Sequence, residues 1–204
     1  AQMLRNAAER RAGETVLVHA GLSGVGSAAV QIASALGAQV IATAGGAEKC
    51  RRVAALGAHH VIDYRDADFA SEVRKITGKS GVEVVFEHVG EATFGGSMKC
   101  LARGGRVVTC GATTGGDVGV SLHQVFFKSL SILGSTMGSK GDLRQVLRMF
   151  DQGRFREEAL VELLTDHPWP VRNVTQNVAD LKAQIAANEK GVRELRKMVG
   201  HFGL

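Results

Sequence analysis

Residues 15–44, TVLVHAGLSGVGSAAVQIASALGAQVIATA, decide the fold of this 204-residue chain. An apolar run at 15–20 leads into a glycine-rich turn, a segment with apolar residues at helical spacing, and a second apolar run at 39–44. The helical segment ends at Gly37, and glycine commonly terminates helices. This succession is typical of a β-α-β unit that joins two parallel strands.

The same alternation of apolar runs and helical segments continues to about Thr136. The four further runs are 59–64, 82–89, 106–111 and 129–135. All the runs are nearly continuous in apolar character, as expected of parallel strands that are covered on both faces. Right-handed crossovers place helices on both sides of such strands. The sequence therefore predicts an α/β fold with a doubly wound six-stranded parallel sheet, a Rossmann fold.

The composition excludes several classes of protein. With 45% hydrophobic residues and two prolines the chain is not intrinsically disordered. It contains no run of roughly 18 apolar residues, the length needed to span a membrane, and its charged first residues do not resemble a signal peptide. We therefore expect a cytoplasmic protein with no membrane partner. The net charge of +5 comes from basic residues interleaved with acids, which argues against nucleic acid as a partner and favours anionic cofactor phosphates.

The sequence offers no metal site and no catalytic group. Its cysteines, Cys50, Cys100 and Cys110, form no C-x-x-C pair, and we expect buried thiols in a reducing compartment. No two histidines stand at helical spacing with a third ligand, and no Ser-His-Asp or paired-carboxylate arrangement can be argued. The histidines are His19, His59, His60, His88, His123, His167 and His201. Catalytic residues therefore stay unassigned, and no metal is expected in this chain.

The turn GLSGVG, which opens at Gly21, has the spacing and context of a dinucleotide-binding loop between a strand and a helix. Gly21 permits the tight turn, while Gly24 and Val25 offer backbone N–H groups to phosphate oxygens. Gly26 lets the helix lie close to the sheet with its positive end toward the anion. Ser23 stands where the pattern has glycine, and its hydroxyl can hydrogen-bond to phosphate. The alternative is a glycine-rich turn without a ligand, which the succession of strands disfavours.

The segment after the second strand bears on the choice of cofactor. An NAD site needs an acid at the end of that strand to hold the ribose 2'-hydroxyl. The chain instead reads AGGAEK over 44–49, where Gly45 leaves room for a 2'-phosphate and Lys49 supplies a positive charge. We therefore expect NADP(H), with Glu48 turned outward by its place on the helix. The alternative is that Lys49 and its neighbouring arginines form a solvated face.

These motifs resemble the cofactor domain of the medium-chain dehydrogenases/reductases, in the branch of zinc-binding alcohol dehydrogenases and quinone oxidoreductases. The resemblance rests on residues 20–49, followed in order by ALGAHHVIDY, VVFEHVG, GGRVVTCGATTG and ILGSTMGS, and it covers about residues 1–153. It implies that Lys49 and Tyr64 meet the 2'-phosphate. It further implies cofactor contacts from His88, Val89 and Gly90 on the adenine or ribose side, and from Gly111, Ala112, Thr113, Ser135, Thr136 and Met137 on the nicotinamide side. Tyr64 could instead cap the sheet, and His88 could be a polar residue at a strand end.

The resemblance also implies a function. Such enzymes transfer hydride between a nicotinamide cofactor and a small-molecule carbonyl, enone or quinone-type acceptor, and we expect the full-length enzyme to be a homo-oligomer. In this family a separate preceding domain supplies most zinc ligands and the substrate pocket. Because the chain begins at Ala1 inside a predicted helix, we expect a fragment that is inactive alone, with zinc only in the missing domain, if at all. The alternative is a non-catalytic NADP(H)-binding or assembly module.

Residues 154–204 form a predicted helical tail beyond this NADP(H)-binding domain of residues 1–153. A helix expected at 140–152 closes the domain, and a connector with both prolines follows at 165–173. Apolar residues then recur at heptad spacing, which indicates either a dimerising coiled coil or a helix packed on another protein surface. The tail resembles a segment of the hydantoinase B/oxoprolinase family. It covers too little of that enzyme to bring hydrolase activity, so we interpret it as a chimeric segment joined near Gly153.

Overall fold

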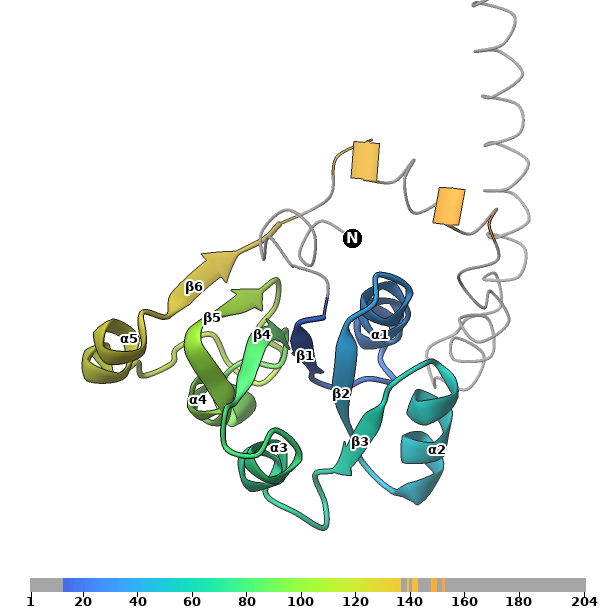
Figure 1. Cartoon of the computed structure of the whole chain (residues 1–204), viewed down its shortest axis with the longest axis horizontal. Coiled ribbons are helices and arrows are strands. Elements are labelled where there is room, and N and C mark those ends of the chain that lie inside the picture. The colour runs from blue at the N-terminus through green and yellow to red at the C-terminus, as the bar shows by residue number, and fades with distance from the viewer. Residues whose placement is uncertain (1–12, 137–138, 140, 143–147, 150–151, 153–204) are drawn as a thin grey trace, which may run out of the picture. The chain divides into compact units, whose positions relative to one another are not determined.

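The computed structural model describes residues 13–136, 139, 141–142, 148–149 and 152 (Figure 1). Within this part of the chain, six parallel strands form one sheet in the order β3-β2-β1-β4-β5-β6. The strands are β1 (Thr15–Val18), β2 (Gln39–Ala44), β3 (His60–Asp63), β4 (Val82–Glu87), β5 (Leu101–Thr109) and β6 (Ser131–Gly134). The helices between them are α1 (Gly24–Ala35), α2 (Ala47–Ala55), α3 (Phe69–Ile76), α4 (Glu91–Cys100) and α5 (Leu122–Lys128). This order is that of a doubly wound dinucleotide-binding sheet and confirms the predicted fold class.

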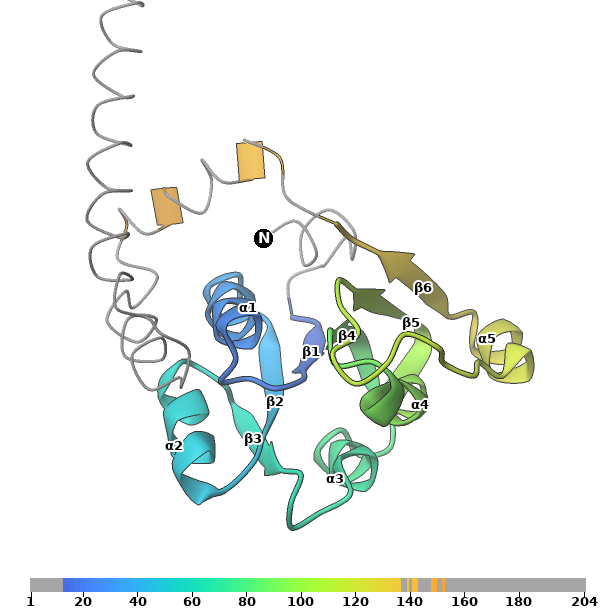
Figure 2. The same cartoon turned by 180° about the vertical axis from the view of Figure 1, so that it is seen from behind.

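Two apolar cores lie on opposite faces of the sheet. In β1, Val16 and Val18 belong to one core and Leu17 to the other, because successive side chains of a strand point to opposite faces. The first core is completed by α1 and by Val53 of α2, and the second by α3 and by Phe94 of α4. Figures 1 and 2 show α1 on the opposite side of the sheet from α3 and α4. Each fully buried Val or Leu stabilises the fold by roughly 1.5–3 kcal/mol, which explains the nearly continuous apolar runs.

The observed strand ends differ from the predicted ones where the backbone turns. β2 has the predicted bounds, whereas β1 ends at Val18 because Ala20 already takes the left-handed conformation, with φ of 45°, that opens the next turn. β5 begins at Leu101, earlier than expected. Leu101 pairs with Val82 of β4 before the register between the two strands shifts. The charged and glycine residues that follow Leu101 hid this first part of the strand from a search for apolar runs.

Helix α1 begins and ends as its sequence indicates. Ser23 caps its first turn, since its hydroxyl oxygen accepts a hydrogen bond from the Gly26 N–H at 3.0 Å. Its last turn is closed by the Leu36 N–H, which donates to the Ile32 carbonyl, and Gly37 follows in the left-handed region with φ of 78°. The helix thus points its N-terminus at the glycine turn after β1.

Helices α2 and α4 begin at glycines with positive φ. Gly46 has φ of 95° and Gly90 has φ of 96°, and neither helix has a side-chain hydrogen bond at its cap. The starts of α1, α2 and α4 therefore lie at the carboxyl ends of β1, β2 and β4. In open α/β sheets ligands bind outside this edge, so the fold itself marks where a site is expected.

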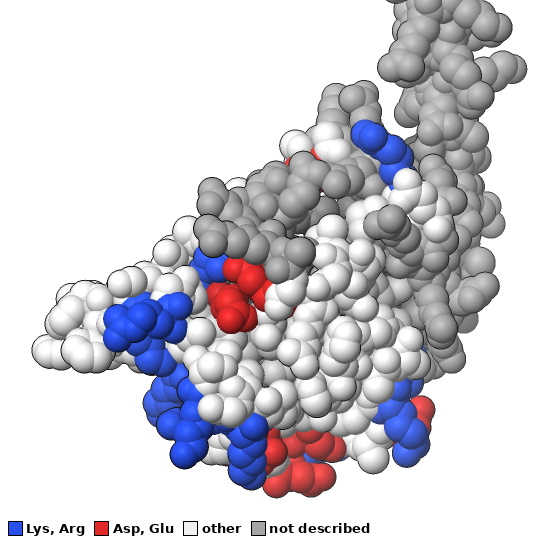
Figure 3. Space-filling model, in the orientation of Figure 1, with Lys and Arg blue, Asp and Glu red and all other residues white. Residues whose placement is uncertain are grey.

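The described helices, one charged face and the residues before the tail bear on the remaining predictions. Among the helices that the structure describes, none has the length and apolar character needed to cross a bilayer. On the face drawn in Figure 3, Lys and Arg side chains lie in separate groups, with Asp and Glu side chains among them along its lower edge. The predicted helix at 140–152 lies mostly outside the described residues, and the tail at 154–204 entirely. Met149 is described, and it is buried in the core on the α1 side.

Candidate functional site

The glycine turn after β1 is fixed by close backbone packing. The N–H groups of Ala20 and Gly21 donate to the side-chain and backbone oxygens of Thr43, at 3.1 and 2.8 Å. A Cβ atom on Gly26 would overlap the Ala20 carbonyl, and one on Gly21 would lie 3.0 Å from a methyl carbon of Val53. Gly26 is therefore required by the fold itself, whether or not a ligand is bound, while a side chain at Gly21 would force Val53 to shift.

The middle of the same turn is open. Gly24 and Val25 are exposed, and a Cβ atom on Gly24 would meet nothing within 4 Å. Both residues lie in the first turn of α1, where backbone N–H groups have no partner within the helix. Ser23 uses its oxygen to cap α1, so only its O–H remains to donate to a phosphate. Open space in front of a helix N-terminus fits the pyrophosphate of a dinucleotide.

An acid from β3 reaches the loop after β2. Strands β2 and β3 pair with Ala44 opposite Asp63. The Asp63 carboxylate accepts the Gly46 N–H, at 2.9 and 3.0 Å from its two oxygens, and the Arg65 N–H at 3.0 Å. These backbone hydrogen bonds, from Gly46 first and then from Arg65, lower the pKa of Asp63. The sequence prediction concerned an acid at the end of β2. Asp63 instead stands at the end of β3, and it reaches the loop after β2 because the two strands are neighbours in the sheet.

Three of the predicted cofactor residues lie together at this loop. A Cβ atom on Gly45 would be 2.5 Å from the Tyr64 hydroxyl oxygen, so the phenol ring lies directly against Gly45. Tyr64 keeps 52% of its surface exposed, and Lys49 is exposed in the first turn of α2. Glu48 forms an ion pair with Arg51 on the exposed side of that helix. The Glu48 side chain is thus engaged with a neighbour on its own helix.

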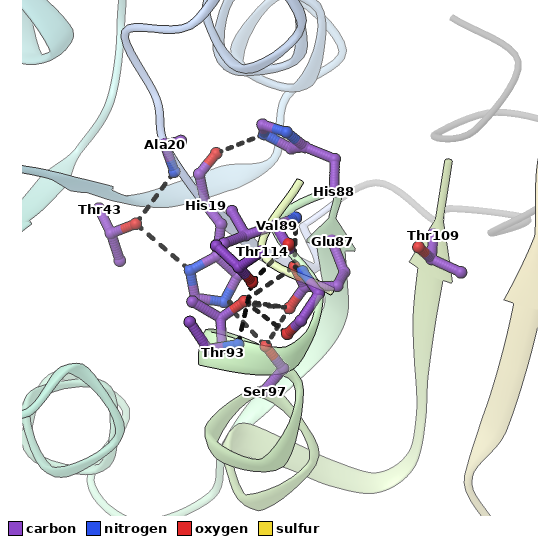
Figure 4. Close-up of polar contacts among 12 residues, drawn as sticks. His19, Ala20, Thr43, Glu87, His88, Val89, Thr93, Ser97, Thr109 and Thr114 are labelled. Atoms are coloured by element: carbon purple, nitrogen blue, oxygen red, sulfur yellow. Dashed lines mark hydrogen bonds and ion pairs between the residues drawn. The ribbon is translucent and has the colours of Figure 1, made fainter. Parts of the chain in front are cut away.

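The loop after β4 is held from both sides. His88 is buried, and its Nε2 lies 2.9 Å from the His19 carbonyl, to which it donates (Figure 4). From the other side, the Thr114 hydroxyl and N–H both donate to the Val89 carbonyl at 2.8 Å. The Thr113 hydroxyl donates to the His88 carbonyl at 3.1 Å. The Thr113 side chain, predicted on the nicotinamide side, is therefore engaged with the chain itself.

A hollow of about 580 Å³ lies between the ends of β4, β5 and β6. This volume is in the range of small-molecule sites. It is lined by Gly90, Phe94, Thr109, Cys110, Gly111, Ala112, Gly115, Gly116, Val118, Gly134, Ser135 and Thr136. Of the residues predicted on the nicotinamide side, Gly111, Ala112, Ser135 and Thr136 thus line one hollow, and Met137 lies outside the described residues.

The cysteines differ from one another. Cys100 is buried as expected, and burial raises the pKa of its thiol to about 12. Cys50 is half-buried. Cys110 is exposed at the hollow, so the expectation of a buried thiol was wrong for this residue. The reason is its position one residue beyond β5, where the chain leaves the sheet and enters the loop.

A buried polar network lies beneath the glycine turn (Figure 4). The Ser97 hydroxyl donates to the Glu87 carboxylate at 2.7 Å, so its oxygen is left to accept from Nε2 of His19 at 2.8 Å. Nδ1 of His19 lies 3.3 Å from the Thr43 hydroxyl and accepts from it, since that oxygen already receives the Ala20 N–H. These contacts fit a neutral His19 with its proton on Nε2. Burial, opposed by the Glu87 charge, lowers the pKa of His19 to about 4.

Glu87 is completely buried yet well supplied with donors. Besides Ser97, its oxygens accept the Val89 N–H at 2.8 Å, the Gly90 N–H at 3.2 Å and the Thr93 hydroxyl at 2.9 Å. Burial raises the pKa of Glu87, but the charge of His19 when its ring is protonated and these hydrogen bonds together lower it by more. The network joins the turn after β1 to the loop after β4. Sequence reasoning missed it, although both acid and histidine stand at the ends of strands that prove to be neighbours.

The described residues do not fit a zinc site. Nowhere in the part of the chain that the structure describes do three or more His, Cys, Asp or Glu side chains gather in a way that could hold a metal ion. A structural or catalytic zinc needs at least three such protein ligands.

Two family models match the chain. Residues 24–152 match the model described as zinc-binding dehydrogenase. Residues 136–204 match the model described as hydantoinase B/oxoprolinase. Both resemblances seen in the sequence are thereby supported, and the two matched ranges overlap at residues 136–152. The overlap includes the end of the predicted cofactor domain.

Curated relatives are similar over part of their length. A quinone oxidoreductase of Salmonella typhimurium is 42% identical over 120 residues, which cover 59% of this chain and 37% of that protein. A quinone oxidoreductase of Rattus norvegicus is 31% identical over 180 residues, which cover 87% of this chain and 54% of that protein. The chain thus spans about half or less of the length of these relatives.

Solved structures of other proteins share this fold, and they too match over part of their length. An NAD-dependent alcohol dehydrogenase is 44% identical with a TM-score of 0.71, over 76% of this chain and 45% of the other. The 2-octenoyl-CoA carboxylase reductase CinF, solved with NADP and 2-octenoyl-CoA, is 28% identical with a TM-score of 0.69. That match covers 76% of this chain and 39% of the other. The structural similarity therefore covers about three quarters of this chain.

Proposed function

The chain belongs to the zinc-binding dehydrogenase family, and from this premise we propose that it binds NADP(H) as the cofactor-binding part of an oxidoreductase. Its homologues are quinone oxidoreductases and alcohol dehydrogenases. The bound nicotinamide supplies hydride to a small carbonyl, enone or quinone-type acceptor. The chain's own residues bind and orient the cofactor.

The observation that carries this proposal is the contrast within the turn after β1. Gly26 is required by the packing of α1 on the turn, whereas the position of Gly24 is open and faces no protein atom within 4 Å. The first turn of α1 at Gly24 and Val25 is exposed, so its backbone N–H groups are accessible to an anion. A pyrophosphate placed there receives backbone N–H groups and the positive end of α1.

The preference for NADP(H) rests on the loop after β2. The similar structures do not decide between NAD and NADP, since one is named an NAD-dependent enzyme and another was solved with NADP. The end of β2 carries Ala44, Gly45 and Gly46 in place of the acid that an NAD site uses. Asp63 lies nearby, but both of its oxygens accept backbone N–H groups. The Tyr64 ring fills the space beside Gly45 that was expected to receive the 2'-phosphate, so the exposed side of Tyr64 and Lys49 are the groups offered to that phosphate.

The acceptor side of the reaction needs groups beyond the described residues. The hollow between β4, β5 and β6 can receive the nicotinamide half of the cofactor, and its lining is made largely of glycine and other small residues. Within it, Thr109, Cys110, Ser135 and Thr136 are the polar side chains. We infer that the residues which bind the acceptor and stabilise its developing charge lie outside the described part of the chain. The chain by itself should bind cofactor without measurable turnover.

We also propose that the protein associates with a second copy through α5 and β6. None of the residues of α5 is buried. Among the residues that the structure describes, β6 pairs with β5 and has no strand on its other side. The large exposed apolar residues here are Leu122, Phe126, Phe127 and Ile132. An open edge without charged side chains on its strand can pair with the same edge of another copy, because a twofold axis makes such an edge self-complementary. Sedimentation velocity over a range of concentrations tests this association.

The cofactor choice is tested by calorimetric titration of NADPH and NADH into the chain and into its Lys49→Ala variant. We expect the chain to bind NADPH about tenfold or more tightly than NADH, because a cation at the 2'-phosphate adds a charge-assisted interaction. Lys49→Ala should remove most of this difference. Equal affinities in the unmodified chain would show that the loop after β2 does not recognise the phosphate.

A further inference from the structure

The end of β3 brings a second cation to the loop after β2. Arg65 follows Tyr64, and its backbone N–H is held by the Asp63 carboxylate at 3.0 Å. A Cβ atom placed on Gly46 would lie 3.4 Å from the terminal Nη1 of Arg65. The guanidinium therefore folds back from β3 and lies beside the residue that begins α2.

The Arg65 guanidinium has no protein partner that uses its donors. Its side chain forms no hydrogen bond or ion pair with any of the residues the structure describes. Elsewhere in the same part of the chain, Arg51 pairs with Glu48, and Arg106 pairs with Glu14 at 2.8 Å. Two acids flank Arg65 in the sequence, Asp63 and Asp66. Asp63 accepts backbone N–H groups with both of its oxygens, and among the described residues neither carboxylate forms an ion pair with the guanidinium. The planar set of N–H donors on Arg65 is thus available to a ligand at Gly46.

We propose that Arg65 binds the 2'-phosphate of NADP(H) directly and is a second determinant of cofactor choice beside Lys49. This inference rests on the proposed function, because it requires the adenine ribose to lie at the loop after β2. A guanidinium can grip two phosphate oxygens at once, which an ammonium group cannot. Lys49 lies in α2 and Arg65 in the turn that follows β3, so the two cations reach the phosphate from different segments.

Arg65 also offsets the charge of Asp63. A carboxylate beside a 2'-phosphate repels it, whereas the same carboxylate can accept a hydrogen bond from a 2'-hydroxyl. With Arg65 present, the positive guanidinium compensates Asp63 and the site accepts a phosphate. Without it, the carboxylates of Asp63 and Asp66 are the charges that remain just after β3, and the site should accept the unphosphorylated ribose at least as well as before.

The test is calorimetric titration of the chain with two matched pairs of ligands. NADPH and NADH differ by the 2'-phosphate, and so do adenosine 2',5'-bisphosphate and AMP. In Arg65→Gln we expect about tenfold weaker binding of NADPH and of the bisphosphate, with NADH and AMP changed by less than about twofold. Arg65→Lys should lie between, because it keeps the charge but loses the paired donors. Arg51→Gln is the matched control, since Arg51 is exposed and already paired with Glu48, and it should behave as the unmodified chain.

The outcomes separate this inference from the function on which it rests. If the unmodified chain binds NADPH and NADH equally, the proposed cofactor choice is wrong and the role of Arg65 fails with it. If the unmodified chain prefers NADPH and Arg65→Gln keeps that preference, only the role of Arg65 is overturned. Equal weakening of both dinucleotides in Arg65→Gln would also overturn it, because that result indicates a damaged loop. Thermal melting of each variant establishes that the fold is intact.

Discussion

The turn after β1 and the loop after β2 both face the same edge of the sheet, yet they are built differently. The first is fixed by buried contacts, since Gly26 lies against the Ala20 carbonyl and Thr43 holds the backbone of the turn. The second is lined by residues such as Tyr64 and Arg65, which are exposed and follow the neighbouring strand β3. The first is therefore sensitive to any change in packing, while the second can change its side chains without disturbing the core.

This difference assigns separate tasks to the two regions. The turn after β1 determines whether a dinucleotide binds at all, because the pyrophosphate is common to every such cofactor. The loop after β2 determines which dinucleotide binds, because the 2'-phosphate is what distinguishes NADP(H). Variants in the first region should affect NADPH and NADH alike, and variants in the second should affect their ratio.

The largest effect is expected for Gly26→Ala. The new methyl group would overlap the Ala20 carbonyl, so α1 or the turn must move. Overpacking of this kind costs typically 1–3 kcal/mol, and the shift also displaces the N–H groups that face the pyrophosphate. We expect a lower midpoint in urea unfolding together with loss of both NADPH and NADH binding in calorimetry. A Gly26→Ala protein with unchanged stability would contradict the close packing described for this turn.

Gly24→Val should separate binding from folding. Its side chain enters the open space in front of α1, where no protein atom lies within 4 Å of the new Cβ atom, so urea unfolding should change little. The same space is assigned to the pyrophosphate, and we expect both dinucleotides to bind about a hundredfold more weakly or not at all. Retention of binding would place the cofactor elsewhere. Paired with Gly26→Ala, this variant shows whether the two glycines have distinct roles.

A smaller effect is expected from acid, through the network beneath the turn. The pKa of His19 is about 4 in the folded chain, below its ordinary value of 6.5, so between these values the unfolded chain binds a proton that the folded chain does not. Stability therefore rises with pH across this window and is lost as the pH falls through it. The pKa of Glu87 is also lowered, so its contribution is present above its ordinary value and is lost at still lower pH. Glu87 and His88 are the charged or titratable groups that act on His19. The protonation of His19 and that of Glu87 both lower the stability as the pH falls.

The pH effect is measured by urea unfolding at pH 7, 6, 5 and 4. We expect the free energy of unfolding to fall by on the order of 3 kcal/mol between pH 7 and pH 4, since each unit of pKa difference is worth about 1.4 kcal/mol. His19→Gln should flatten this dependence, because it removes the titrating ring. His123→Gln, a change at an exposed histidine, should leave it unaltered. A pH dependence that persists in His19→Gln would assign it to other groups.

The sequence predicted the fold because the features that set it are local. Apolar runs and the glycine turn identify β1, α1 and β2 directly, since each depends only on residues adjacent in the chain. The first part of β5 was missed because Arg103 and the glycines after it interrupt the apolar pattern. That segment joins the sheet through its pairing with Val82, a contact between strands that no local pattern contains.

The candidate site could be predicted from the sequence only where all its residues belong to one continuous segment of the chain. The turn after β1 could be read from its glycines, whereas Asp63 and Arg65 act at a loop that begins some twenty residues earlier. Their proximity follows from the pairing of β2 with β3, which places Ala44 opposite Asp63. The contacts of Thr113 likewise depend on the approach of two loops. What the sequence could not give was therefore the set of neighbours across the sheet.

The smallest effect is expected from removing residues 154–204. The described part of the glycine turn, the loop after β2 and the hollow all lie at or before Thr136. A chain that ends at Gly153 keeps Met149, which is buried in the core on the α1 side, so this core should stay intact. We therefore expect NADPH affinity within about threefold of the full chain, a change of less than 1 kcal/mol by the relation between affinity and free energy.

The same truncation tests the predicted role of the tail. Its apolar residues recur at heptad spacing, so a tail that is not part of the cofactor domain should promote association of the full chain, which sedimentation detects as a dependence on concentration. Removal of the tail should weaken that association and leave any contribution of α5 and β6. If the truncated chain fails to fold, while the full chain is a stable monomer with slow amide exchange in the tail, the tail must pack on the cofactor domain. The division near Gly153 would then be wrong, and the region of the molecule that matters for stability would extend beyond the two regions compared above.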